Sequence, residues 1–151
     1  MSITAAQDAF VRARAGDCCE YCLLPESGGT LTFHVDHIRP IKHNGSDDSD
    51  NLCLACYKCN GYKGDNISGY DPETDNLTPL YHPRQQRWDD HFRVEADCTI
   101  NGLTPEGRTT LYVLKISEES RVQLRQFLAE LGMYPCQNEN NQNRARQSNI
   151  T

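Results

Sequence analysis

The stretch FHVDHIRPIKHNGSDDSDNLCLACYKCNGYKGD, which runs from Phe33 to Asp65, decides the fold of this chain. Apolar and polar residues alternate from Phe33 to Asp36, and a loop rich in Gly, Asn, Asp and Ser then leads to the apolar run NLCLAC. Such alternation and such turn residues predict two strands joined by a loop. The predicted order is a strand over 31–38, a loop over 39–50, a strand over 51–56 and a short helix within 57–65.

Two CxxC pairs, CEYC at residues 19–22 and CYKC at residues 56–59, predict a metal site. A CxxC turn can place two thiolates on one tetrahedral ion, and two such turns complete a four-sulfur structural zinc site. Binding of this kind contributes on the order of 10 kcal/mol to folding. The expected zinc ligands are Cys19, Cys22, Cys56 and Cys59. The alternatives are a disulfide or redox pair, and unliganded thiols in the core.

The choice of ligands among the eight cysteines has an ambiguity. Cys53 and Cys56 are also spaced as CxxC, and Cys18 stands beside Cys19. The apolar sequence around Cys53 suits a buried strand, so we interpret Cys53 as a small core residue. Cys18 would need a CxxxC spacing to pair with Cys22, which is less usual. Two isolated cysteines receive no role, Cys98 and Cys136.

The stretch also resembles the HNH endonuclease family, in the subgroup that carries a four-cysteine zinc site. The resemblance rests on VDHIRP, NGSDDSDNLCLAC and CNGYKGD, which occur in the family's order and spacing over about residues 17–65. The segments DPETDNLTPLYHPRQQRWDDHF and GLTPEGRTTL are similar to a group of small HNH proteins common in cyanobacteria. The resemblance implies an α+β fold: a ββα-metal (His-Me finger) core with a structural zinc site, plus a C-terminal hairpin and helices.

The resemblance implies an activity as well, the metal-dependent hydrolysis of phosphodiester bonds in DNA by nicking or double-strand cleavage. His37 is then the general base, because a neutral imidazole can take a proton from water near neutral pH. Asp36 and Asn60 are the implied ligands of a catalytic divalent ion, Mg²⁺ or another, since hard cations prefer oxygen ligands. Asn51 is implied to pin the loop over 38–50 and so to hold His37.

Each of these residues also has a structural interpretation. Asp36 and His37 are compatible with a polar pair at a sheet edge, and on a regular strand their side chains point to opposite faces. The implied site therefore requires a bend near Ile38. Asn51 is compatible with a strand cap, and Asn60 with a helix cap.

Two further residues are candidates for substrate binding. His34 stands two positions before Asp36 and either faces the groove or is a surface histidine. Lys63 follows Asn60 by three residues, which places the two on one face of the short helix. It either contacts phosphate or is a solvated lysine.

The remaining chain is predicted to cover this core. We predict helices over 4–15, 103–114 and 117–132, a hairpin over 91–102, and an irregular segment over 66–90. In the last helix we expect Ser117 as N-cap and an apolar stripe of Leu124, Phe127, Leu128 and Leu131. A length of 151 residues is typical of one domain. This domain is expected over 1–136, with a core at 17–65, a wrapping part at 66–136 and a disordered polar tail at 137–151.

Charge limits the class of partner. The formal net charge is −6, and the core stretch has no excess of basic residues, so affinity from phosphate neutralisation is expected to be modest. We expect DNA as partner with weak sequence preference, and RNA as the alternative substrate. The alternative function is a non-catalytic zinc-stapled module that binds nucleic acid or protein. No apolar run approaches the roughly 20 residues of a membrane helix and the N-terminus lacks a signal-peptide pattern, so a cytoplasmic protein is expected.

Overall fold

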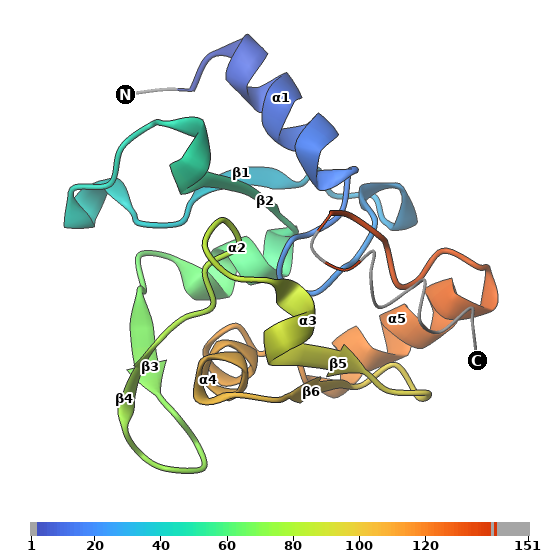
Figure 1. Cartoon of the computed structure of the whole chain (residues 1–151). Helices are drawn as coiled ribbons and strands as arrows, with labels where there is room; N and C mark the ends of the chain where they lie inside the picture. The colour runs from blue at the N-terminus through green and yellow to red at the C-terminus, as the bar shows by residue number, and fades with distance from the viewer. Residues whose placement is uncertain (1–2, 140, 142–151) are drawn as a thin grey trace.

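The structure, a computed structural model, describes residues 3–139 and 141, so most of the tail predicted at 137–151 lies outside the described residues. In this part of the chain, short helices combine with three two-stranded sheets (Figure 1). Within the described residues, no helix joins the length and the apolar character that crossing a lipid bilayer requires.

Helix α1, Ala5–Ala15, packs on the first hairpin and is closed at both ends by its own sequence. Thr4 caps the N-terminus in a capping box, and Gly16 ends the helix in the left-handed conformation with φ 61°. That conformation suits glycine, which has no Cβ to clash. The helix buries Val11 and Ala15, and the predicted N-terminal helix is confirmed.

The decisive stretch forms a hairpin followed by a helix. Strand β1, His34–His37, pairs antiparallel with β2, Leu52–Ala55, and α2, Tyr57–Lys63, follows directly. The register places Asp36 opposite Cys53. Strand β2 is buried along its whole length, as its apolar sequence predicts. The predicted order of elements is confirmed, although β1 begins later than the predicted strand.

The segment after α2 contains a hairpin where the sequence predicted irregular structure. Strands β3, Ser68–Tyr70, and β4, Leu77–Pro79, pair antiparallel. Buried Asp71 holds the turn between them, because its carboxylate accepts hydrogen bonds from the Glu73 N–H and from the Arg108 guanidinium. The Arg108 hydrogen bonds also hold the pKa of Asp71 well below its usual range. A turn fixed by an arginine far along the chain leaves no local sequence pattern.

A further hairpin and three helices lead to the end of the described chain: α3 (Trp88–His91), β5 (Phe92–Val94), β6 (Ile100–Gly102), α4 (Pro105–Val113) and α5 (Glu119–Glu130). The predicted hairpin is confirmed by the pairing of β5 with β6. Helix α4 begins as predicted, with Thr104 as N-cap and Pro105 in the first turn. It contacts both the β3–β4 and the β5–β6 hairpins.

Helix α5 differs from its prediction. It begins at Glu119 after Glu118, so Ser117 is not its cap. Of the expected apolar stripe only Leu128 is buried, whereas Leu124, Phe127 and Leu131 are exposed. The buried positions belong instead to Arg121 and Arg125. The helix packs on backbone carbonyl groups and thiols, which guanidinium groups can satisfy and leucines cannot.

Buried aromatic side chains connect the CEYC segment with the second half of the chain. The rings of Tyr21 and Tyr81 meet edge to face at 6.4 Å. The Trp88 indole donates to the Tyr21 carbonyl at 2.9 Å, and Phe92 packs against the Tyr81 and Trp88 rings. These contacts place the first CxxC pair against a core to which both halves contribute.

Candidate active site and metal centre

Four buried cysteines converge into one cluster, Cys19, Cys22, Cys56 and Cys59. Their sulfur atoms all lie within 4.8 Å of one another. The Cys22 and Cys56 sulfurs are 3.8 Å apart. With Zn–S bonds of about 2.3 Å, a tetrahedral zinc places its sulfur ligands roughly 3.8 Å from each other. The four thiols therefore fit zinc in number, chemistry and spacing.

Local backbone geometry prepares each CxxC turn for this role. Cys56 is the N-cap of α2, and its sulfur accepts the Cys59 N–H at 3.4 Å. In the first turn the Cys19 sulfur accepts the Cys22 N–H at 3.5 Å. Backbone N–H groups that point at sulfur favour the thiolate form, which is the form that binds metal. Because Cys56 caps α2 and Cys59 lies within it, an ion bound here would fix that helix.

The structure resolves the ambiguity over Cys53 as predicted. Its side chain is buried away from the four-sulfur cluster, 3.6 Å from the Tyr21 hydroxyl and 3.9 Å from Asp36 Oδ2. Burial raises the pKa of this thiol well above its usual value, which suits an unliganded core residue. The second CxxC pair is thus Cys56 with Cys59.

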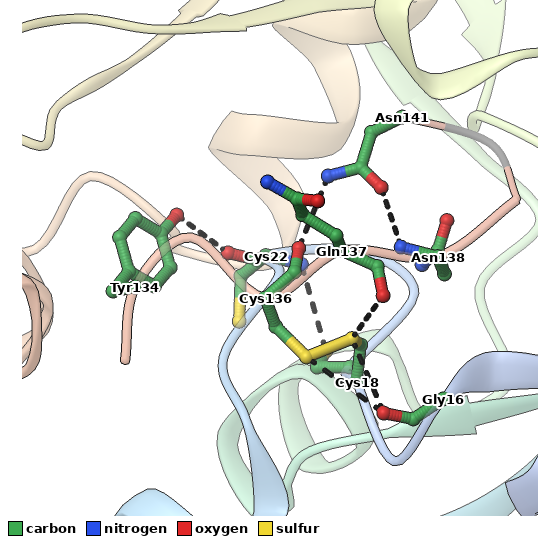
Figure 2. The surroundings of a disulfide bond; sticks show 9 residues. Gly16, Cys18, Cys22, Tyr134, Cys136, Gln137, Asn138 and Asn141 are labelled. Atoms are coloured by element: carbon green, nitrogen blue, oxygen red, sulfur yellow. Dashed lines mark hydrogen bonds between the residues drawn. A yellow bond between two sulfur atoms is a disulfide. The ribbon is translucent and has the colours of Figure 1, made fainter. Parts of the chain in front are cut away.

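Cys18 and Cys136, to which the sequence analysis gave no role, form a disulfide. Figure 2 shows how the pair attaches the segment around Cys136 to the first CxxC turn. The Tyr134 hydroxyl donates to the Cys22 carbonyl at 2.8 Å, and the Cys136 N–H donates to the Leu23 carbonyl at 3.0 Å. A separation of 118 residues hides this pairing from local spacing.

This disulfide corrects an assumption of the sequence analysis. Disulfides persist mainly in oxidising compartments, whereas the sequence led us to expect a cytoplasmic protein. The bond involves Cys18 and leaves its neighbour Cys19 free for the four-sulfur cluster. The zinc interpretation therefore stands beside the disulfide.

Three of the predicted catalytic residues line one pocket of about 430 Å³, namely Asp36, His37 and Asn60. Asp36 and His37 end β1, and Asn60 projects from α2. Regular alternation would put Asp36 and His37 on opposite faces of a strand. The pocket lies where β1 ends, and both residues contribute to its wall.

His37 is paired with a carboxylate that the sequence analysis missed. Its Nε2 lies 2.7 Å from Asp47 Oδ1, and the two side chains are 18% and 24% exposed. Asp47 belongs to the loop between β1 and β2 and lies in an acidic run that is typical of a solvated surface. Its position ten residues from His37 gives no motif by which it could have been found.

Asp36 is buried in a polar environment of its own. Its Oδ2 forms an ion pair with the Lys63 ammonium at 3.0 Å. Burial raises the pKa of Asp36, and the charge of Lys63 opposes that rise. The Lys63 ammonium also donates to the His37 carbonyl at 3.0 Å. One lysine of α2 therefore holds both residues that end β1.

Lys63 differs from the expected phosphate contact. Its side chain is 2% exposed, and its ammonium is directed at Asp36 rather than at solvent. The same ion pair explains the burial, since a lysine is buried only when its charge is compensated. The pocket's exposed cation is Lys42, which follows the turn after β1.

Asn51 pins the loop after β1 through its side-chain amide. Its Oδ1 accepts the Arg39 N–H at 2.9 Å, and its Nδ2 donates to the carbonyls of Arg39 and Ser46 at 3.0 and 2.8 Å. These bonds close the loop, which the resemblance had implied. Among the described residues, the Asn51 side chain bonds to Arg39 and Ser46 and not to His37, whose carbonyl accepts from the Lys63 ammonium instead.

His34 lies outside the pocket. It begins β1, is exposed, and its ring centroid is 6.2 Å from that of Tyr57. The residues that line the pocket begin one position later, at Val35. The geometry therefore favours a surface position for His34 over a place beside Asp36 and His37.

Comparison with known proteins assigns the decisive stretch to a family. Residues 19–66 match the family model described as HNH endonuclease. The matched span begins at the first cysteine of the four-sulfur cluster and ends just beyond α2, so it contains both the metal centre and the pocket. No curated protein and no solved structure matches the chain.

Proposed function

Because residues 19–66 carry an HNH endonuclease domain, we propose that this chain is a metal-dependent endonuclease that hydrolyses phosphodiester bonds in DNA. One observation carries the proposal: Asp36, His37 and Asn60 line a single open pocket. The antiparallel β1–β2 hairpin followed by α2 supports a ββα-metal arrangement of these groups. Domain organisation follows as proposed, with the HNH region as core and residues 66–136 as its cover.

His37 is the proposed general base. Asp47 accepts a hydrogen bond from Nε2–H when its carboxylate is ionised, which leaves the lone pair on Nδ1 to receive a proton from water. The carboxylate also stabilises the imidazolium that forms in that step. The Lys63 contact to the His37 carbonyl holds the backbone from which the ring projects.

Asp36 and Asn60 are the proposed ligands of a divalent ion such as Mg²⁺. Their oxygen atoms fit a hard cation, and an open pocket leaves room for the water ligands that Mg²⁺ keeps. Such an ion supplies Lewis-acid stabilisation of negative charge on phosphate oxygens. Since Asp36 already pairs with the Lys63 ammonium, it would share its carboxylate between that ammonium and the ion. Lys63 thus moderates the negative charge of the buried site.

The zinc centre and the pocket are linked through α2. Cys56 and Cys59 are at the start of this helix, Asn60 is the next residue, and Lys63 ends it. A zinc ion on the four thiolates would therefore fix the helix that carries Asn60 at the pocket and Lys63 at the Asp36 carboxylate. We propose a structural role for zinc and a catalytic role for the second ion.

The proposed partner is DNA, bound with weak sequence preference, and RNA is the alternative substrate. Lys42 is exposed at the pocket and replaces Lys63 as the candidate phosphate contact. The net charge of −6 opposes strong electrostatic attraction, so bound divalent ions contribute to neutralising phosphate. Affinity is therefore expected to fall as salt concentration rises.

The rival function is a zinc-stapled module that binds nucleic acid or protein without cleaving it. Its support is the buried Asp36–Lys63 pair, since a carboxylate already paired with an ammonium can serve the fold alone. An incubation of zinc-loaded protein with supercoiled plasmid separates the two functions. Nicked or linear product with Mg²⁺ or Mn²⁺, and none with EDTA, is expected. Intact plasmid, linear DNA and RNA under all these conditions would favour the binding module.

Replacing Asp47 by asparagine is expected to lower cleavage by about 10–100-fold, the usual effect of losing a partner that orients a ligand or base. An amide can donate as well as accept, so it no longer enforces the tautomer protonated at Nε2. Imidazole ¹⁵N NMR of the variant should show a changed tautomer ratio for His37. The control Asp48→Asn removes the same charge one residue away. Equal activity and equal spectra in the two variants would remove Asp47 from the mechanism.

A further inference from the structure

Arg121 reaches the four-sulfur cluster from a distant part of the sequence. It lies on α5, is 7% exposed, and its Nη2 is 2.9 Å from the Cys59 sulfur and 3.7 Å from the Cys56 sulfur. Its Nη1 donates to the Leu114 carbonyl at 2.6 Å, just beyond α4. One guanidinium thus connects the cluster with the two C-terminal helices.

This guanidinium needs a negative partner. Arginine stays charged in proteins, and a buried charge is costly unless it is paired. Among the described residues, no ion pair joins Arg121 to a carboxylate. The groups within reach of Nη2 are the sulfurs of Cys59 and Cys56. Four thiolates outweigh the charge of one Zn²⁺, so the loaded cluster carries the negative charge that Arg121 requires.

We propose that Arg121 is the counter-charge of the zinc–thiolate cluster, a positioning residue that strengthens zinc binding and attaches α5 to the metal centre. The inference depends on zinc at the cluster and is independent of the nuclease activity. Coupling of this kind is reciprocal: the cation stabilises the loaded cluster, and the loaded cluster stabilises the docked helix.

The chain supplies a matched control for this proposal in Arg125. It lies one turn further along α5 and is 1% exposed. Its Nε donates to the Cys98 carbonyl at 2.9 Å and its Nη1 to the Ile116 carbonyl at 3.0 Å. Both arginines therefore anchor α5 by similar bonds to backbone, and only Arg121 has a bond to the cluster.

The test compares Arg121→Gln with Arg125→Gln in the full-length zinc-loaded protein. Zinc transfer to a chromogenic chelator should show a 10–100-fold weaker affinity in Arg121→Gln, the usual loss for a residue that hydrogen-bonds to metal ligands. Arg125→Gln should keep the wild-type affinity even if it unfolds at a lower temperature. In cobalt-substituted protein the sulfur-to-metal charge-transfer band should shift in Arg121→Gln alone. Equal affinity and equal bands in the two variants would overturn the proposal.

A second measurement needs no variant, in case Arg121→Gln does not fold. In wild-type protein loaded with ¹¹³Cd, the Arg121 guanidinium protons should exchange slowly with water and couple to the metal through the hydrogen bond to Cys59. The Arg125 protons should show no such coupling. Absence of the coupling at Arg121 in a protein that holds the metal would refute the role. Wild-type protein that folds without retaining any metal would refute both the zinc assignment and this proposal, whatever its nuclease activity.

Discussion

Replacing His37 by alanine is expected to reduce strand cleavage by about 10²–10⁴-fold, the usual contribution of a general base. The substitution removes the imidazole and keeps the backbone carbonyl that Lys63 holds. The carboxylate of Asp36, the amide of Asn60 and the four-sulfur cluster remain in place. Plasmid nicking rates at saturating Mg²⁺ measure the effect directly, because they report the chemical step with both metal sites filled.

The fold should tolerate this change. The His37 side chain is partly exposed, and it pairs with Asp47, whose side chain is also partly exposed. Loss of a surface-accessible pair of this kind costs little stability. Zinc content and the unfolding temperature of His37→Ala should therefore match the wild type. A variant that lost zinc or unfolded early would show that the residue supports the fold rather than the reaction.

His34 offers the matched control, since it is a histidine on the same strand whose side chain lies outside the pocket. His34→Ala should cut nearly as fast as the wild type, with at most a modest rise in the DNA concentration needed. If His37→Ala cut at the wild-type rate and His34→Ala did not, the base would be His34. The pocket would then have been assigned to the wrong face of the strand.

Local spacing was enough to predict the four-sulfur cluster and the β1–β2–α2 elements beside it. A CxxC turn brings two sulfurs together within four residues, so the spacing in CEYC and CYKC is enough to predict two pairs of neighbouring sulfurs. The alternation before Ile38 likewise predicts a strand, and the apolar run of β2 predicts that this second strand is buried. For this reason the choice of Cys56 with Cys59 over Cys53 followed from the character of the neighbouring residues.

Contacts between distant segments could not be predicted in the same way. Arg121 meets Cys59 across 62 residues, and Cys136 meets Cys18 across 118. Neither Arg121 nor Cys136 lies in a segment whose local sequence pattern indicates such a contact. Arg121 occupies a helix with apolar residues at helical spacing. Three of these, Leu124, Phe127 and Leu131, are exposed, because the inward face of the helix contacts carbonyls and sulfurs.

In the pocket, too, local motifs could be predicted from the sequence and tertiary contacts could not. Asp36, His37 and Asn60 were found through the resemblance of their motifs, and the structure brings them to one cavity. The contacts that hold them were not predicted, because Asp47 lies in an acidic loop and Lys63 was expected either to contact phosphate or to be solvated. The spacing of Lys63 from Asn60 does not predict whether the lysine is buried. Only the tertiary contact with Asp36 reveals it.

Replacing Cys56 by alanine is expected to leave the protein unfolded or insoluble. Cys56 belongs to the four-sulfur cluster, and its sulfur also caps α2 by accepting the Cys59 N–H. Loss of a cap costs about 1 kcal/mol. Zinc binding contributes on the order of 10 kcal/mol, which is comparable to the whole stability of a typical domain, about 5–15 kcal/mol. The lost free energy of zinc binding is therefore expected to decide the outcome. Circular dichroism measures the folded fraction, and zinc analysis measures the metal content.

Cys53→Ala is the control that separates metal binding from burial. Cys53 is fully buried three residues before Cys56, but its sulfur lies beside Tyr21 and Asp36 rather than in the cluster. Removing it leaves a small cavity, with an expected cost of about 1 kcal/mol and full zinc content. Zinc lost from Cys53→Ala and retained by Cys56→Ala would mean that the second CxxC pair begins at Cys53. Folded, zinc-free protein in both variants would mean that the core alone holds the fold, and α2 would then need no metal to present Asn60 to the pocket.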